Sequence, residues 1–290
     1  MSLQRKVVQV QTPPEQQGFL GPGHTARPVV QGDFFDTDPF IVLMDDMLDK
    51  QDEDPVGGAH PHAGFETVSL LLEGEMGDSA HKMQAGDFQI MTAGSGIIHT
   101  ETIDTKARMR LLQLWLTLPQ KDRWTTPKVQ NLPKSHVPTL SEEGLEINVY
   151  SGSLAGLQSP IQNHVPIIVS DVRMQSNTET ILQLPASYTS FLYVIEGGVM
   201  AGENQKPILQ DEVGWLDRLS DVGESELKLT AGNSGVRVIL YSGLPQGETI
   251  ASHGPFIGNT QEDIQRLYKQ FKEGKMQHIS TVPGKHQITW

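Results

Sequence analysis

Apolar and polar residues alternate along several short segments of this chain. In the segment 108–119, Leu112, Leu114, Leu116 and Leu118 fall on one face of an extended strand, because successive side chains of a strand point to opposite sides. Gly, Pro or Asp bounds most of the other apolar runs, which is typical of antiparallel all-β domains. These runs cover residues 39–46, 66–76 and 87–94 in the first half of the chain, and 164–174, 179–185, 189–202, 212–219 and 227–243 in the second.

One segment near the C-terminus has the period of a helix instead. Thr260 is placed to cap this helix together with Asp263, and Gly274 is placed to end it. We therefore expect an all-β fold with one short C-terminal helix. The apolar face of the helix consists of Ile264, Leu267, Tyr268 and Phe271.

The two halves of the chain resemble each other. The pair Glu73-Gly74 recurs as Glu196-Gly197, 123 residues later, and Asp87 recurs as Asp211, 124 residues later. Two matches at nearly the same offset indicate two similar domains. Four prolines between Pro119 and Pro138 suggest that the connection lies there. We predict a first domain over residues 1–132, a linker over 133–145 and a second domain over 146–290.

The composition excludes several classes of function. The chain of 290 residues has 22 Lys and Arg against 35 Asp and Glu, a formal charge of −13, and no cysteine. An acidic chain without a basic run does not favour direct binding of nucleic acid. Without cysteine there is no disulfide, no thiolate ligand and no cysteine nucleophile. We found no apolar window long enough for a membrane span and no signal peptide, so we expect a soluble cytoplasmic protein.

The candidate chemistry lies in two short motifs of the first half. His60 and His62 are separated by one residue, and so are His99 and Glu101. Alternate residues of a strand share a face, so neighbouring strands would bring three imidazoles and a carboxylate to one point. Such a set suits a divalent transition metal: Fe(II), Mn, Ni, Cu or Zn. Glu66 competes as a ligand, because it would share the face of His62 if no bulge intervenes.

Six other histidines and two further glutamates have an ordinary interpretation. We assign Glu73 and Glu75 to a solvated hairpin. Applied to His60 and His62, the repeat offset leads to Gln183 and Pro185, and His99 leads to Val222 or Gly223. The second half therefore lacks the ligands, and we expect one metal ion per chain. We assign to the surface, or to hydrogen bonds in the core, His24, His81, His136, His164, His278 and His286.

These motifs resemble the signature of the pirin family, within the cupin superfamily. The similarity is carried by "HPHAGFETVSLLLEGEMGD", "GDFQIMTAGSGIIHTE", "LQLWLTLPQKDRWTTPKVQ" and "HGPFIGNTQEDI". Pirins are bicupins, with two jelly-roll β-barrels in tandem and a metal in the N-terminal barrel alone. The resemblance implies that the second barrel is degenerate and that the iron ligands are His60, His62, His99 and Glu101. It leaves Glu66 as a residue that supports the ligands.

The chain departs from the family pattern at one position beside the ligands. Ala63 stands where many relatives have Arg, in the sequence HPHRG. A lost guanidinium beside the mouth of the metal site would change the charge of the pocket.

The resemblance implies two functions. Bacterial relatives include quercetin 2,3-dioxygenases, which open a flavonol ring with O2 and release carbon monoxide. In that case the metal is Fe(II), Glu101 is the catalytic base, and Phe65 and Met91 supply apolar walls, although core packing suits both of these residues better. The alternative is an iron-binding regulator without turnover, which binds a transcription factor or a metabolic enzyme according to the redox state of the metal. Animal pirins of that kind are nuclear. A purely structural metal fits less well, since structural sites are closed and often contain thiolates.

Overall fold

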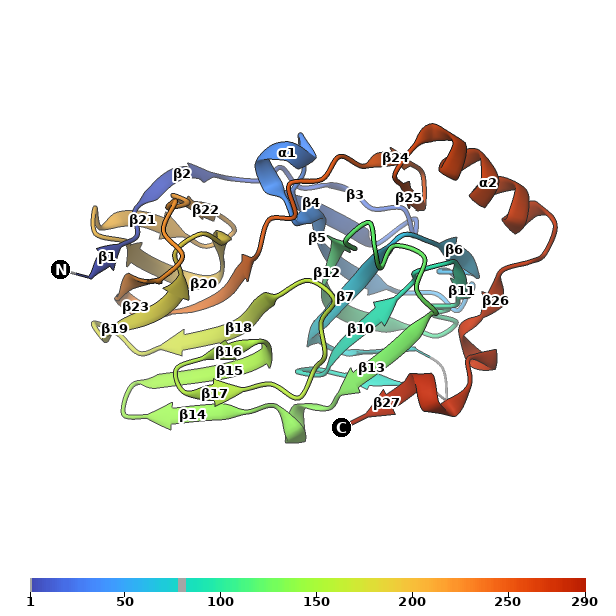
Figure 1. The fold of residues 1–290 in the computed structure, drawn as a ribbon. Coiled ribbons are helices and arrows are strands. Elements are labelled where there is room, and N and C mark those ends of the chain that lie inside the picture. Colours follow the sequence, from blue (N-terminus) through green and yellow to red (C-terminus); the bar gives the residue numbers. More distant parts are fainter. Residues whose placement is uncertain (1, 78–81) are drawn as a thin grey trace. The chain divides into compact units, whose positions relative to one another are not determined.

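The computed structural model describes residues 2–77 and 82–290, and most of the elements are β-strands (Figure 1). The chain divides into two compact units. Unit 1 consists of Met1–Pro14 and Val137–Pro245, and unit 2 of Glu15–His136 and Gln246–Trp290. Each unit therefore combines residues from two separate parts of the sequence.

The strands of unit 2 form a large sheet and several small ones. The large sheet has the order β27-β13-β10-β7-β12-β5-β4-β3, and a small sheet has the order β26-β11-β6. The bounds in the large sheet are β3 (Gln16–Gln17), β4 (His24–Val30), β5 (Phe40–Lys50), β7 (Phe65–Glu73), β10 (Phe88–Thr92), β12 (Ala107–Thr117), β13 (Lys128–Leu132) and β27 (Gln287–Thr289). The other elements are α1 (Phe34–Thr37), β6 (His60–His62), β8 (Glu75–Met76), β9 (Met83–Gln84), β11 (Ile97–His99), β24 (Ala251–His253), β25 (Phe256–Gly258), α2 (Gln261–Lys272), β26 (Gln277–His278) and the 3-10 turns Lys134–His136, Ile279–Thr281 and Gly284–His286.

Unit 1 repeats the order of strands seen in unit 2. Its main path runs β14-β15-β18-β23-β20-β22-β2, and the long strand β23 also pairs with β1 and β19. Apolar residues from the inward face of these strands, such as Leu182, Leu192 and Leu227, are buried in a single core cluster. The bounds are β1 (Leu3–Gln4), β2 (Val7–Gln11), β14 (Thr139–Glu142), β15 (Leu145–Ser151), β16 (Ser153–Leu154), β17 (Leu157–Gln158), β18 (Ile167–Met174), β19 (Glu179–Pro185), β20 (Thr189–Ala201), β21 (Lys206–Leu209), β22 (Val213–Leu216) and β23 (Glu224–Gly243).

The compact units differ from the predicted domain boundaries at both ends of the chain and at the linker. The prediction assigned residues 1–132 to one domain, but β2 pairs with β22 and so belongs to unit 1. It assigned 146–290 to the other domain, but β26 pairs with β11 and β27 with β13, in unit 2. Within the predicted linker 133–145, β14 is already a strand of unit 1. Both ends of the chain complete a sheet edge that distant residues leave open, and local patterns carry no sign of this pairing.

The internal repeat is present, with one correction to its register. Gly74 and Gly197 adopt positive φ of 78° and 74°, and a Cβ at either would lie 2.1 Å from a backbone oxygen. Both glycines thus occupy the same kind of crowded bulge. At the second match, however, Asp87 corresponds to Glu212 and not to Asp211. The Asp87 carboxylate accepts from the amide of Gln84, and that of Glu212 accepts from the amide of Leu209, both at 2.8 Å.

The predicted C-terminal helix is confirmed as α2. The Thr260 hydroxyl accepts a hydrogen bond from the Asp263 amide, and the Asp263 carboxylate accepts one from the Thr260 amide. Ile264 and Leu267 are buried against Phe256 and its neighbours, whereas Phe271 retains 37% of its surface. The predicted apolar face is therefore buried at the start of the helix and open at its end.

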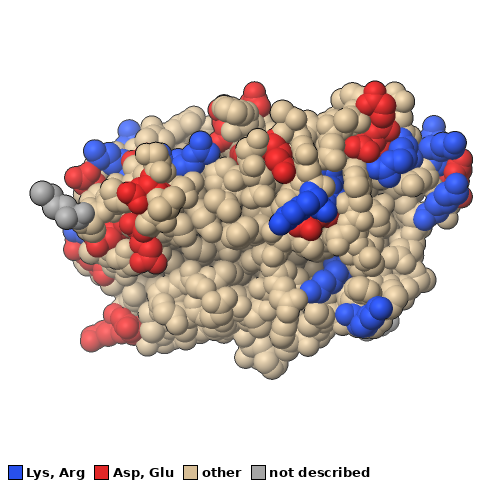
Figure 2. Space-filling model, viewed as in Figure 1, with Lys and Arg blue, Asp and Glu red and all other residues tan. Residues whose placement is uncertain are grey.

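The surface of the face in view carries mixed charge. Lys and Arg side chains lie near Asp and Glu side chains along the upper part of this face and toward its two ends, and most of the remaining surface in view is uncharged (Figure 2). Among residues 2–77 and 82–290, no helix has both the length and the apolar character that crossing a bilayer requires.

Candidate metal centre

The two ligand motifs lie on adjacent antiparallel strands. β6 pairs with β11 so that His60 stands opposite His99 and His62 stands opposite Ile97. Directly opposite residues of an antiparallel pair share a face, and so do alternate residues of one strand. The pairing therefore directs the three imidazoles to the same side of the small sheet, as the alternating pattern predicts.

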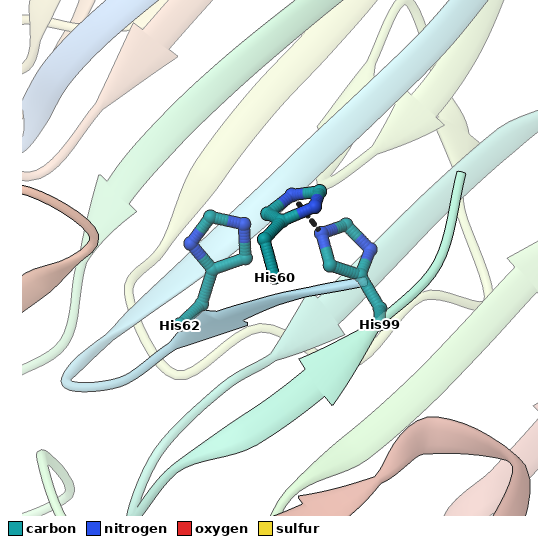
Figure 3. Close-up of side chains that lie close together, drawn as sticks. All are labelled: His60, His62 and His99. Carbon is teal, nitrogen blue, oxygen red and sulfur yellow. Dashed lines mark hydrogen bonds between the residues drawn. The ribbon is translucent and has the colours of Figure 1, made fainter. Parts of the chain in front are cut away.

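The three imidazoles converge on one point (Figure 3). One ligand nitrogen from each of His60, His62 and His99 lies within 4.8 Å of the other two. The Nε2 atoms of His60 and His99 are 2.7 Å apart. Two ligands at about 2.1 Å from an ion and at right angles would be roughly 3 Å apart, so the observed spacing fits a transition metal after a small adjustment.

Backbone and aromatic contacts orient these rings. Nδ1 of His60 lies 2.9 Å from the Gly58 carbonyl oxygen, so this nitrogen donates and Nε2 is left for a ligand role. The ring of His62 packs edge-on against Phe65 and Trp115, with centroids 5.2 and 5.4 Å away. The buried Nδ1 of His62 makes no hydrogen bond of ordinary geometry with the described residues, although the backbone of Pro255 lies near enough to affect its pKa.

The environment keeps two of the histidines neutral. Burial lowers the pKa of His62 well below its usual value, and the neighbouring His99 and His60 lower it further. Burial likewise lowers the pKa of His99 to about 3, and His60 and His278 act in the same direction. A neutral imidazole is the form that binds a metal ion, so near pH 7 both rings are ready to serve as ligands. The three-histidine group can bind a metal.

Glu101 lies beside this group and outside it. β11 ends at His99, so Glu101 does not continue the alternation that the sequence suggested. Its Oε1 is 3.8 Å from Nδ1 of His99, the ring nitrogen opposite the one that faces His60, and it accepts a hydrogen bond of 3.4 Å from Nε2 of Gln113. Burial raises the pKa of the Glu101 carboxyl, while His60 and then Gln113 act to lower it.

Two neighbouring positions have roles that the sequence left open. Glu66 is fully buried in β7, where its Oε1 accepts a hydrogen bond of 2.6 Å from Thr92, and it does not belong to the group of converging ligand atoms. Ala63 is also fully buried, and it packs with Phe256 and Leu267 from the C-terminal segment. Position 63 therefore faces β25 and α2, and the effect of the lost guanidinium on the charge of the pocket stays a prediction.

A cavity of about 610 Å³ adjoins His60 and His62. Sequence reasoning missed most of its walls. Phe65 and Met91 are completely buried in the core, as their likelier role implied. The lining residues of β5 and β12 could have been identified from the period-2 pattern of "VLMDD" and "LQLW". This pattern places alternate residues of each strand on the side that faces the cavity. The other lining residues are Phe19, Leu20, Val42, Met44, Asp46, Val56, Gly57, Gly58, Gln113, Trp115 and Pro255.

Comparison with known proteins agrees with this architecture. The family profile described as "Pirin" matches residues 23–116, and the profile described as "Pirin C-terminal cupin domain" matches residues 169–277. The chain belongs to the pirin family. Both units are thus cupin-type domains, and the pirin fold with two such domains and a short C-terminal helix is confirmed.

Three individual pirins and relatives are similar over most of their length. "Pirin-like protein 2" of Arabidopsis thaliana is 34% identical over 249 residues, which cover 82% of this chain and 75% of that protein. The crystal structure of a quercetin 2,3-dioxygenase from Acinetobacter baumannii matches with a TM-score of 0.82 and 25% identity, over 94% of this chain and 98% of that one. A bacterial pirin from Escherichia coli, solved in complex with nickel(II), has the same fold, with a TM-score of 0.60 and 18% identity over 82% of this chain and 98% of that one.

Proposed function

We propose that this pirin is a metal-dependent dioxygenase of the quercetin 2,3-dioxygenase type, which opens a flavonol ring with O2 and releases carbon monoxide. The proposal depends chiefly on one observation: three histidines converge at the edge of a large and mostly apolar cavity. A metal that only tethers strands needs no such cavity. The similarity to a quercetin 2,3-dioxygenase supports the same assignment.

His60, His62 and His99 would hold the ion, and we propose Fe(II), with Mn, Ni, Cu or Zn as the other ions that this donor set suits. A bound ion would supply Lewis-acid activation of the flavonol 3-hydroxyl. We also propose Glu101 as the fourth ligand. The known relative with nickel(II) supports a transition metal in general and not iron in particular.

Glu101 is the residue we propose to accept the proton of the 3-hydroxyl. Its Oε1 lies next to His99, and it shares the lining of a small side cavity with His60 and Gln113. Burial raises its pKa, and a carboxylate of raised pKa is a stronger base than an exposed one. The Gln113 amide donates to Oε1 and fixes the direction in which the carboxylate points.

The cavity walls suit a flat aromatic ligand. Val42, Met44 and Trp115 lie on adjacent strands in register, where Trp115 stands opposite Val42 and Gln113 opposite Met44. Apolar and aromatic walls with a few polar groups are typical of small-molecule sites. They would bind the rings of a flavonol and keep water away from the reacting carbon atoms.

Anaerobic loading of the metal-free protein with Fe(II), followed by quercetin and then air, tests the proposal. We expect quercetin loss, O2 uptake and carbon monoxide release in equal amounts, and none of these with protein left metal-free. Iron-loaded protein that binds the metal but consumes no flavonol would reject the dioxygenase and favour the iron-binding regulator. A protein partner and a cytoplasmic location stay predictions.

A further inference from the structure

The cavity beside the histidines has a carboxylate in its mostly apolar wall. Val42, Met44 and Asp46 are alternate residues of β5, so they point to the same side of the strand, and all three line the cavity. Asp46 also lines the smaller cavity that contains His60 and Glu101. A charged residue is uncommon in such a row, because its burial costs free energy unless a partner compensates it.

The neighbouring Asp45 shows how a partner can fully offset the cost of burying a carboxylate. Asp45 points to the opposite side of β5, where Arg110 donates to both of its oxygens at 3.0 and 2.7 Å. Asp46 has a single oxygen engaged: Oδ1 lies 2.9 Å from Nε2 of His24. In the part of the chain that the structure describes, we find no other side-chain partner for Asp46, which retains 8% of its side-chain surface at the cavity.

His24 holds this carboxylate in a fixed orientation. The Leu20 amide donates to Nδ1 of His24 at 3.0 Å, so Nδ1 carries no proton and Nε2 is the nitrogen that donates to Asp46. His24 is 1% exposed and stands diagonally across from Asp46, because Ala26 of β4 is the residue directly opposite. Gly18 makes room for the ring, since a Cβ there would lie 2.2 Å from Nδ1.

We propose that Asp46 selects the substrate by accepting a hydrogen bond from a phenolic hydroxyl other than the one at the metal, and that His24 is its positioning residue. The inference rests on the proposed function, because it takes the ligand to be a flavonol. An ionised carboxylate can accept hydrogen bonds but cannot donate one. The site therefore favours aromatic rings that carry free hydroxyls and disfavours rings that carry ether or carboxylate groups at that end.

Ligand binding without turnover tests this role. Metal-loaded protein is kept anaerobic, and the Kd values of quercetin and of 3-hydroxyflavone, which lacks the other hydroxyls, are compared. A hydrogen bond to a charged group contributes about 1.5–3 kcal/mol, so we expect wild type to prefer quercetin roughly 10- to 100-fold. Asp46→Ala should remove this preference, and Asp46→Asn should reduce it.

Two further measurements separate recognition from folding defects. Asp49→Asn, on the same strand but at an exposed position, is the matched control and should keep the wild-type ratio. Gly18→Ala displaces His24 without altering Asp46, and should reduce the ratio. With wild-type protein alone, a flavonol methylated at every hydroxyl except the 3-hydroxyl should bind as weakly as 3-hydroxyflavone.

Three results would overturn the assignment of Asp46. The first is that the wild-type protein binds the two flavonols with equal Kd values. The second is that Asp46→Ala keeps the wild-type ratio of Kd values. The third is that Asp46→Ala weakens the binding of both flavonols by the same factor. The readout is independent of catalysis. If the protein prefers quercetin but releases no carbon monoxide, the dioxygenase proposal is rejected and the role of Asp46 stands. If the protein turns over quercetin but Asp46→Ala keeps the wild-type ratio of Kd values, the role of Asp46 is rejected and the dioxygenase proposal stands.

Discussion

In unit 2 the strand β6 directs His60 and His62 toward the interior, whereas in unit 1 the matching strand β19 directs Leu182 and Leu184 there. The two units otherwise share their order of strands and the glycine bulge of the central hairpin. The same scaffold thus carries a polar site in one copy and an apolar core in the other. In the described residues, the histidine group of unit 2 is the cluster with the spacing of a metal site.

The repeat offset identified the loss of ligands but not what replaced them. It led from His60 and His62 to Gln183 and Pro185, and Gln183 lies on the outward side of β19. The inward side carries Leu182, which pairs with Leu227, and Leu184, which pairs with Ser225. A shift of one position moves every side chain of a strand to the other face, so an offset read from the turns does not fix which residues point inward.

Removal of two ligands should have the largest effect. The double variant His60→Ala and His62→Ala leaves a single imidazole, so we expect metal content per chain to fall to background and any oxygenase activity to fall by at least about 1,000-fold. Elemental analysis of protein purified without added metal, with turnover assays alongside, measures both. Unchanged metal content in this variant would refute the site.

Glu101→Gln should have the next largest effect. As a proton acceptor Glu101 contributes roughly 100-fold or more to kcat, while the three histidines keep the metal. Steady-state kinetics and metal analysis on the same sample distinguish the roles: a loss of kcat at constant metal content supports the base. A parallel fall in metal content would show that binding of the ion depends on Glu101 as the fourth ligand, and the loss of kcat would then not isolate its role as a base.

Leu184→Ala tests whether the apolar core of unit 1 stabilises the fold without contributing to metal binding. Leu184 is completely buried in the core of unit 1, so we expect a loss of about 2–5 kcal/mol in the free energy of unfolding. Metal bound per folded chain should stay at the wild-type value. Denaturant unfolding followed by metal analysis makes the measurement, and loss of metal at full folding would show that the two units do not divide their roles in this way.

The metal-free protein should become less stable as the pH falls below 6.5. His99 has a pKa of about 3 in the folded state against an ordinary value of 6.5, so between these values the unfolded chain binds more protons than the folded one. The contribution of the neutral His99 to the free energy of unfolding is therefore fully present above about pH 6.5. It is lost progressively as the pH falls toward 3. Between pH 6.5 and 5 we expect His99 to account for about 2 kcal/mol of this loss.

Urea unfolding of EDTA-treated protein at the two pH values measures that loss. His99→Asn removes the titrating group and keeps the carboxylates, so it should lose less stability over the same interval. Equal losses in wild type and in this variant would show that His99 is not held neutral.

Local chemistry determined much of this protein. Alternating leucines predicted β12, Thr260 with Asp263 predicted the start of α2, and the spacing of His60 and His62 predicted two rings on one face. Each of these depends on the fixed geometry of a strand or a helix turn, which a few adjacent residues settle. The pirin signature determined the family for the same reason, since its motifs are short and contiguous.

Only the tertiary structure decided which distant segments complete each unit and which side chains meet at the site. The pairing of β2 with β22 and of β26 with β11 joins residues that are far apart in the sequence. The end of β11 at His99 sets Glu101 beside the ligands, and the register of β4 on β5 brings His24 to Asp46. Which strands pair, and in which register, depends on residues that are far apart in the sequence, and many alternative pairings satisfy the same local patterns. These contacts therefore cannot be predicted from short segments of the sequence.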